Sequence, residues 1–218
     1  MWYEANAHNP VPWLPHPFAN VAAVPPAAAR PPLSHRLADL LLTDAVQKVS
    51  FTVGHVIVLP AKFRAVSEAL RDGRITVLVD PARLANEGSV AMYLNNRFWG
   101  HENAFMFASD AILDTPTGRA TAVHEALHAA MDIAAQGTAI RNEEGAAFVM
   151  ECLYAKNTGM TALGGVTQTI MDVASDLWSR MEGGERPARA TATQINALRR
   201  EMATSFGYEN AHYSHDGA

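Results

Sequence analysis

Two histidines four residues apart, His124 and His128, stand in the segment AVHEALHAAMD, with Glu125 directly after the first of them. Residues four apart lie on the same face of an α-helix, so the two imidazole rings can converge on one ion. Zinc binds imidazole nitrogen at about 2.0–2.1 Å, and such a pair supplies two corners of a tetrahedral site. Glu125 is displaced around the helix and is expected to act as a general base on zinc-bound water. The segment therefore predicts a zinc site with hydrolytic chemistry.

The residues around this motif are uncharged at positions 120–123 and 129–131, and Ala126 and Leu127 separate Glu125 from the second histidine. A helix exposed to solvent usually carries charged residues at such positions. We therefore expect the motif on a buried helix, where a bound ion satisfies its polar groups. The alternative is that both histidines are ordinary core or interface residues without a metal.

A catalytic zinc site needs a third protein ligand. Met131 and Ala134 exclude the metzincin pattern, which has glycine and histidine at these two positions. The next glutamates along the chain are Glu143, Glu144 and Glu151, on a segment with helical periodicity. Each is a candidate, although acidic residues in the first turn of a helix are stabilised by its dipole without any metal.

With these glutamates on a following helix, the chain resembles the gluzincins, the thermolysin-like clan of metallopeptidases. In that clan a glutamate on the next helix completes a His, His, Glu site, and a small residue often follows it by three positions, as Ala146 and Ala147 do here. The resemblance covers roughly residues 74–156, and the aspartate that the clan usually has four residues after the ligand is missing. The ligands that the resemblance implies, with Glu144 preferred over Glu143 and Glu151, are His124, His128 and Glu144.

Asp132 lies four residues after His128 on the same predicted helix face. We expect its carboxylate to accept a hydrogen bond from the free ring N–H of His128 and so to fix the tautomer of the ring. The alternative is an exposed residue near the end of a helix. The sequence also offers candidate donors that could stabilise an oxyanion, none fixed by spacing: Tyr154, His101, Tyr208, His212, Tyr213 and His215.

A helix over residues 116–137 is predicted to carry the motif. Thr115 and Pro116 form an N-cap with proline at the first helical position, and Gly137 suits the C-terminal end. Apolar periodicity predicts further helices over residues 142–157, with Asn142 as N-cap, 165–184 and 191–206.

Residues 34–115 are predicted to form a small mixed β-sheet with two helices. The helices are expected over 34–49, with Ser34 as N-cap, and 61–73, and the strands over 50–59, 74–80, 90–94 and 104–108. The first two strands predict a right-handed crossover onto one sheet. The last two predict a hairpin-like return at the sheet edge. The resemblance to the zincins implies that strand 104–108 holds an extended substrate there. The expected class is α+β, zincin-like, with the small mixed β-sheet followed by a helical half.

Composition limits the possible partners. A formal net charge of -5, with 17 Lys and Arg, predicts no nucleic-acid partner, and no apolar run is long enough to cross a membrane. Residues 1–33 are rich in proline and alanine and are interpreted as an arm before a single domain of residues 34–218. Cys152 is the one cysteine, so no internal disulfide forms. Together with the lack of a signal-peptide pattern, this predicts a cytoplasmic protein, or one exported without a cleavable signal.

These observations predict a zinc-dependent metallopeptidase that acts on a peptide or protein substrate. The alternative is a zincin-like metal-binding regulator, sensor or effector without efficient proteolysis. Glu125 favours the enzyme, because a site that only binds metal has no need of a general base.

Overall fold

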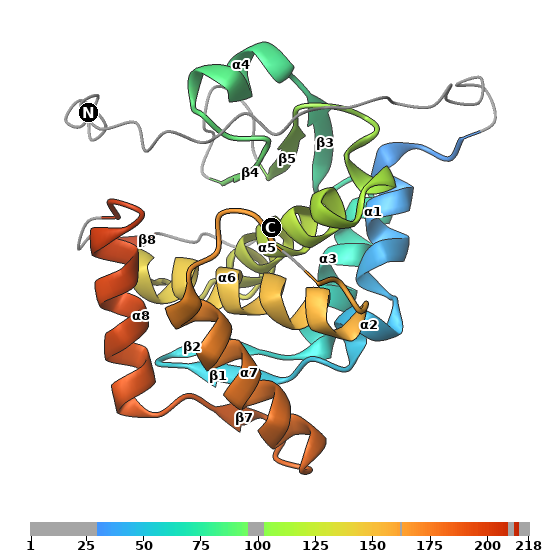
Figure 1. Ribbon diagram of the computed structural model, residues 1–218. Coiled ribbons are helices and arrows are strands. Elements are labelled where there is room, and N and C mark those ends of the chain that lie inside the picture. Colours follow the sequence, from blue (N-terminus) through green and yellow to red (C-terminus); the bar gives the residue numbers. More distant parts are fainter. Residues whose placement is uncertain (1–29, 96–102, 162, 209–211, 214–218) are drawn as a thin grey trace.

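The computed structural model describes residues 30–95, 103–161, 163–208 and 212–213 (Figure 1). Residues 1–29, which make up most of the predicted arm, lie outside these ranges. The described chain is a mixture of helices and short strands, which confirms the α+β class. No helix in the described ranges is both long and apolar enough to cross a membrane.

Helices account for most of the described chain. Those that precede the motif are α1 (Leu33–Leu41), α2 (Asp44–Gln47), α3 (Pro60–Arg71), α4 (Pro81–Asn86) and the short 3-10 helix η3 (Ile112–Asp114). Those in the second half are α5 (Pro116–Ile133), α6 (Ile140–Asn157), α7 (Gln168–Glu182) and α8 (Ala192–Thr204). Helices α5 and α6 pack together at the centre, with α1 and α3 against α5, and with α7 and α8 against α6 (Figure 1).

The predicted helix over 34–49 is wrong in detail, because the chain forms two helices there. The hydroxyl and the backbone N–H of Thr43 both donate to the carbonyl of Leu40, and the side chain of Gln47 donates to the carbonyl of Leu41. These bonds occupy the last carbonyls of α1 and end it. Ser34 lies inside α1, whose N-cap is Pro32.

The strands form three small sheets instead of the single sheet that the sequence predicted. Their members are β1 (Phe51–Val53), β2 (Val56–Val58) and β7 (Ala188–Arg189) in the first, β3 (Thr76–Val79), β4 (Ala91–Leu94) and β5 (Ala104–Phe107) in the second, and β6 (Thr138–Ala139) and β8 (His212–Tyr213) in the third. The predicted strand over 50–59 is a hairpin, because Gly54 adopts a positive φ of 60° and turns the chain back.

The second sheet has the order β3-β5-β4. Strand β4 runs antiparallel to β5, which confirms the hairpin-like return, and β3 runs parallel to β5. The predicted crossover is wrong, because β1 and β3 belong to different sheets and the parallel partner of β1 is β7. The predicted edge strand 104–108 is also wrong: β5 is the central strand, so the edges of this sheet are β3 and β4.

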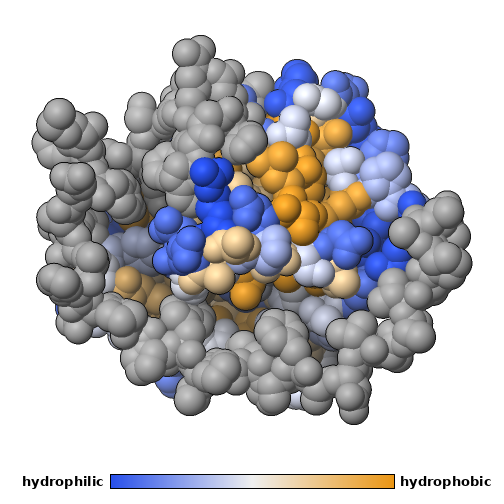
Figure 2. Space-filling model, turned by 90° about the horizontal axis from the view of Figure 1, so that it is seen from above, coloured by the Kyte–Doolittle hydropathy of each residue, from blue (hydrophilic) through white to orange (hydrophobic). Residues whose placement is uncertain are grey.

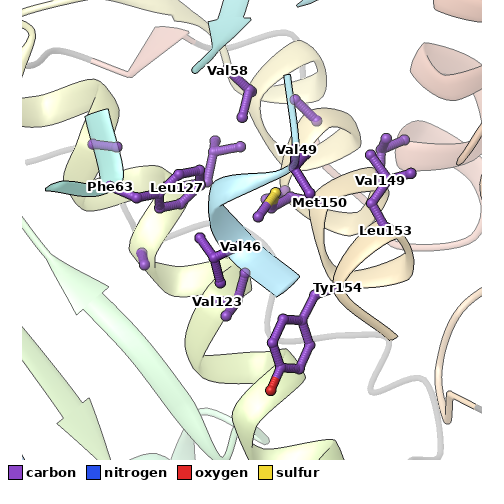
Figure 3. Close-up of a cluster of buried hydrophobic side chains, with 14 of the residues drawn as sticks. Val46, Val49, Val58, Phe63, Val123, Leu127, Val149, Met150, Leu153 and Tyr154 are labelled. Atoms are coloured by element: carbon purple, nitrogen blue, oxygen red, sulfur yellow. The ribbon is translucent and has the colours of Figure 1, made fainter. Parts of the chain in front are cut away.

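Apolar side chains from both halves of the chain meet in one core. Figure 3 shows Val123 and Leu127 of α5 grouped with Met150 of α6, and Phe63 of α3 lies beside Leu127. Burying a side chain of this size stabilises the fold by about 1.5–3 kcal/mol. A smaller cluster covers the other face of the second sheet, where Leu84 of α4 packs.

The surface seen from above, where the second sheet and α4 lie, carries a hydrophobic patch among hydrophilic residues (Figure 2). Val79 at the end of β3 and Val90 just before β4 are each close to half exposed, at 49% and 46%. The core therefore leaves part of this sheet uncovered by described residues.

Candidate metal centre

Helix α5 carries the motif and begins as the sequence predicted. The hydroxyl of Thr115 accepts a hydrogen bond from the backbone N–H of Gly118 at 3.0 Å, and Pro116 occupies the first turn. A Cβ atom at position 118 would overlap the backbone oxygen of Ile112, so glycine lets α5 begin directly against η3. The helix ends at Ile133, before the predicted Gly137, because Ala135 takes a positive φ of 47° and reverses the chain.

Helix α6 carries the candidate glutamates and begins at Ile140, two residues before the predicted cap. Asn142 is not an N-cap. It lies buried in the first turn, and its side-chain oxygen accepts a hydrogen bond from Nε of Arg199 in α8 at 2.7 Å. This bond holds the first turn of α6, so α8 helps to position the glutamates that follow Asn142.

Both motif histidines face one glutamate of α6. Nε2 of His124 lies 3.5 Å from Oε2 of Glu144, and Nε2 of His128 lies 3.7 Å from Oε1 of the same carboxylate. The three side chains are buried, and their candidate ligand atoms all lie within 4.8 Å of one another. In a tetrahedral zinc site with bonds near 2.0–2.1 Å, ligand atoms stand roughly 3.3 Å apart. The structure thus brings together the three predicted ligands at a separation that suits one ion.

The two other glutamates of α6 contact the remaining ring nitrogens. Nδ1 of His128 lies 2.8 Å from Oε1 of Glu143, and Nδ1 of His124 lies 3.3 Å from Oε2 of Glu151. Metal-bound histidines generally donate their second N–H to such a carboxylate, which fixes the tautomer and raises the basicity of the ligand nitrogen. Of the three candidates for the third ligand, Glu143 and Glu151 each contact one Nδ1 atom, and Glu144 alone faces both Nε2 atoms.

The role predicted for Asp132 is wrong. Its carboxylate is fully buried and accepts a hydrogen bond from the hydroxyl of Tyr93 in β4 at 2.8 Å, while Glu143 takes Nδ1 of His128. Helices α5 and α6 run antiparallel, so the later histidine of α5 meets the earlier glutamate of α6. This explains why Glu143, and not Asp132, contacts His128. That pairing is the signal by which Glu143 and Glu151 could have been recognised as partners of the histidines.

Glu125 stands beside the cluster at the edge of the second sheet. Its side chain is half-buried, and Oε2 accepts a hydrogen bond from the backbone N–H of Tyr93 at 2.8 Å. Its charge also reaches both motif histidines and raises the pKa of each. The group predicted to act as general base is thus close to the cluster and is held by β4.

The electric field of the glutamates governs the protonation of the histidines. Burial lowers the pKa of His124, but Glu144, Glu151 and Glu125 outweigh it and hold the pKa well above its ordinary value. Burial likewise opposes protonation of His128, and its carboxylate neighbours raise its pKa. A metal ion requires the neutral rings, so it competes with protons for this site.

Aromatic rings line the cluster on the side of α8. The ring of Phe148 meets that of His124 edge-on, with centroids 4.6 Å apart, and Phe206 stacks against Phe148 at the same separation. These rings keep water from one side of His124 and lower the local dielectric, which strengthens electrostatic interactions there.

Of the predicted oxyanion donors, Tyr154 and Tyr208 alone have side chains among the described residues. His101 and His215 lie outside the described residues, as do the side chains of His212 and Tyr213. The backbone oxygen of Tyr208 accepts a hydrogen bond from Arg141. Tyr154 of α6, the sixth candidate, lines a cavity at the start of α5 together with Pro116 and Arg119.

The chain matches no protein-family model, no curated protein and no solved structure.

Proposed function

We propose that this protein is a zinc-dependent metallopeptidase with a zincin-like fold. The observation that carries the proposal is that His124 and His128 present Nε2 to Glu144 while Glu125, the next residue on α5, stays half-buried beside them. Two imidazoles and a carboxylate gathered in a buried position form a donor set that zinc prefers. The same cluster resembles the His, His, Glu site of the gluzincins.

Each residue has a task in peptide hydrolysis. Zinc, when bound in such a site, polarises a carbonyl group and acidifies water. Glu125 accepts the proton of the attacking water and donates it to the leaving nitrogen. The backbone N–H of Tyr93 holds one oxygen of that carboxylate, so its orientation is fixed before substrate arrives. Glu143 and Glu151 hold the ring N–H groups of the two histidines and keep their tautomers constant.

The substrate belongs on β4 instead of the strand that the sequence suggested. Among the described residues β4 pairs with β5 alone, so its second edge can receive an extended peptide. Tyr93, in this strand, is hydrogen-bonded to Glu125, so a peptide along β4 would pass the general base.

The second candidate function is a metal-binding sensor or regulator, or an effector, without efficient proteolysis. Its support is the low exposure of the ligand group, 7% for His124, 8% for His128 and 4% for Glu144. Structural metal sites are closed in this way, whereas catalytic sites keep a position open.

One experiment separates the two functions. Zinc content by elemental analysis and hydrolysis of casein are measured for wild type, Glu125→Gln, Glu144→Ala and, as control, the exposed Glu68→Gln. We expect Glu144→Ala to lose zinc and Glu125→Gln to keep zinc but lose hydrolysis. Full zinc in Glu144→Ala refutes the ligand assignment. Undiminished hydrolysis by Glu125→Gln refutes the mechanism, and zinc-loaded wild type without any hydrolysis favours the sensor.

A further inference from the structure

A second polar site lies at the other end of the α5–α6 pair. A cavity of about 390 Å³ opens there between the first turn of α5 and the last turn of α6. Its described lining comprises Pro116, Thr117, Arg119, Tyr154, Thr158, Gly159, Met160 and Thr161. Arginine is the one charged residue among them, and none is acidic.

Tyr154 is the observation that points to a ligand. The residue is 3% exposed, and its ring packs into the core beside Val123 and Leu153 (Figure 3). Its hydroxyl lies at the far end of the ring and makes no hydrogen bond to any described residue. Because Tyr154 lines the cavity, its hydroxyl can donate a hydrogen bond to a polar occupant.

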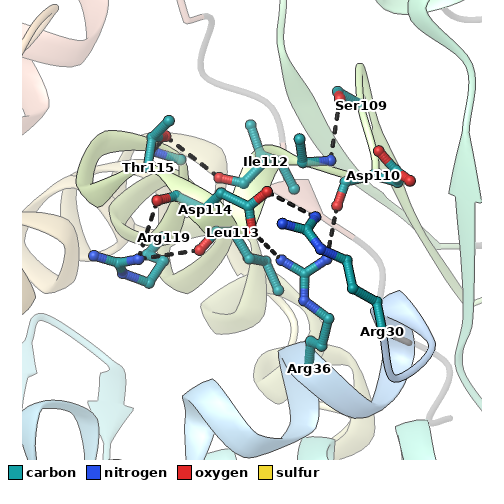
Figure 4. Close-up of polar contacts among 11 residues, drawn as sticks. Arg30, Arg36, Ser109, Asp110, Ile112, Leu113, Asp114, Thr115 and Arg119 are labelled. Carbon is teal, nitrogen blue, oxygen red and sulfur yellow. Dashed lines mark hydrogen bonds and ion pairs between the residues drawn. The ribbon is translucent and has the colours of Figure 1, made fainter. Parts of the chain in front are cut away.

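Arg119 supplies the charge. Its Nη1 donates to the carbonyls of Leu113 and Asp114, at 3.1 and 3.5 Å, which fixes the guanidinium (Figure 4). Within the described chain Nε and Nη2 have no hydrogen-bond partner, and these two N–H groups form the parallel pair that binds oxyanions in a bidentate manner. The nearby carboxylate of Asp114 does not cancel this charge, because Arg30 and Arg36 bind it at 2.8 and 2.5 Å.

The first turn of α5 adds a further donor. Amides in the first turn of a helix lack intrahelical partners and carry the positive end of the helix dipole, and Thr117 offers such an N–H beside the cavity. The end of α6 does not oppose an anion with free oxygens, because the carbonyls of Tyr154 and Ala155 both accept hydrogen bonds from the residues that follow them. The described lining thus provides donors and no acidic group, which favours an anion over a cation as the occupant.

We propose that this cavity is an oxyanion-binding site, in which the guanidinium of Arg119, the hydroxyl of Tyr154 and the amide of Thr117 hold a phosphate or carboxylate group. The site is independent of the proposed peptidase function, because it shares no residue with the metal cluster. Along the helices, Arg119 is five residues before His124, and Tyr154 is three residues after Glu151.

Isothermal titration calorimetry of the full chain with inorganic phosphate tests the proposal, and sodium acetate is the second probe. We expect saturable binding of at least one probe, weakened about tenfold or more in Tyr154→Phe and in Arg119→Gln. The exposed Arg200→Gln removes the same charge elsewhere and is the matched control. A preference for phosphate over acetate identifies a phosphate group as the occupant, and the reverse identifies a carboxylate. Neither substitution changes a residue of the metal cluster. An anion bound to a metal ion there would keep its affinity in both variants, so a loss of anion affinity is assigned to the cavity.

Tyr154→Phe also distinguishes a ligand role from a structural one. Because the hydroxyl has no hydrogen-bond partner among the described residues, its removal should leave the midpoint of denaturant unfolding unchanged or slightly raised while anion affinity falls. Two results overturn the proposal: no saturable binding of either probe up to about 10 mM, or binding that both substitutions leave intact. Loss of zinc or of hydrolysis in other variants has no bearing on either result.

Discussion

Replacing Glu143 by glutamine should weaken zinc binding without removing a ligand. The carboxylate is fully buried, and its oxygen lies 2.8 Å from Nδ1 of His128. Glutamine keeps the shape and can still accept through its amide oxygen, but it removes the negative charge that makes the opposite ring nitrogen a stronger base. Loss of such a carboxylate typically costs about 10–100-fold in metal affinity, or roughly 1.4–2.7 kcal/mol.

The same reasoning ranks the three glutamates of the cluster. Glu151 contacts Nδ1 of His124 at the longer distance of 3.3 Å, so Glu151→Gln should lose about tenfold, at the low end of the range. Glu144 faces both Nε2 atoms and is itself the proposed ligand, so Glu144→Gln should lose more than about 100-fold. The expected order of the losses is therefore Glu144, Glu143, Glu151.

Competition with a chromophoric zinc chelator at one fixed pH measures these affinities directly. Glu182→Gln, an exposed change at the end of α7, removes one negative charge far from the cluster and should bind zinc as wild type does. Circular dichroism of each variant establishes that the helices are intact. Wild-type zinc affinity in Glu143→Gln, or a larger loss of zinc affinity in Glu151→Gln than in Glu144→Gln, would refute the roles that the distances assign to these glutamates.

Three further predictions concern protonation and packing. The raised pKa values of His124 and His128 mean that, without metal, both stabilise the fold fully below the unfolded value of about 6.5 and lose this contribution as pH rises through their folded values. Zinc needs neutral rings, so thermal unfolding midpoints with and without zinc should diverge as pH rises, and a constant difference would contradict this. Burial and the charge of Glu151 raise the pKa of Cys152 to about 12, so a thiol reagent at neutral pH should modify the native protein far more slowly than the unfolded chain. Leu127→Ala, at a side chain 1% exposed, should lower the free energy of unfolding in denaturant by about 2–5 kcal/mol, and a loss under about 1 kcal/mol would contradict the packing.

Local signals in the sequence were sufficient to predict the start of α5 and the common face of its two histidines. Thr115 and Pro116 fix the start of α5 through bonds within one turn, and the spacing of His124 and His128 fixes their common face. The sequence limits the candidates for the third ligand to three glutamates. It does not determine which of them is the ligand, since periodicity does not determine how a short helix is rotated against its neighbour. That rotation is set by the packing of α5 against α6, and the sequence of neither helix alone determines it.

The sheets could not be predicted because strands this short choose their partners through distant contacts. Strand β1 pairs with β7, which lies near the end of the chain, and two residues on each side make the whole pairing. Apolar, mostly β-branched residues stand on both sides of Gly54, so the hairpin of β1 and β2 has the composition of one strand. Asp132 was misassigned for the same reason, since its partner Tyr93 comes from a strand whose position no local pattern reveals.

The charge of the cluster provides a further argument for a bound cation. Four glutamates, one on α5 and three on α6, surround two histidines, and burial lowers the pKa of Lys62 although the charge of Glu143 raises it. Confining so many negative charges in a poorly solvated region is unfavourable unless positive charge accompanies them. In the absence of metal the histidines gain protons, as their raised pKa values show. A divalent ion held by the two histidines and Glu144, as we propose, would supply the same positive charge without protons. The acidity of the cluster and its proposed metal binding would then have one physical cause.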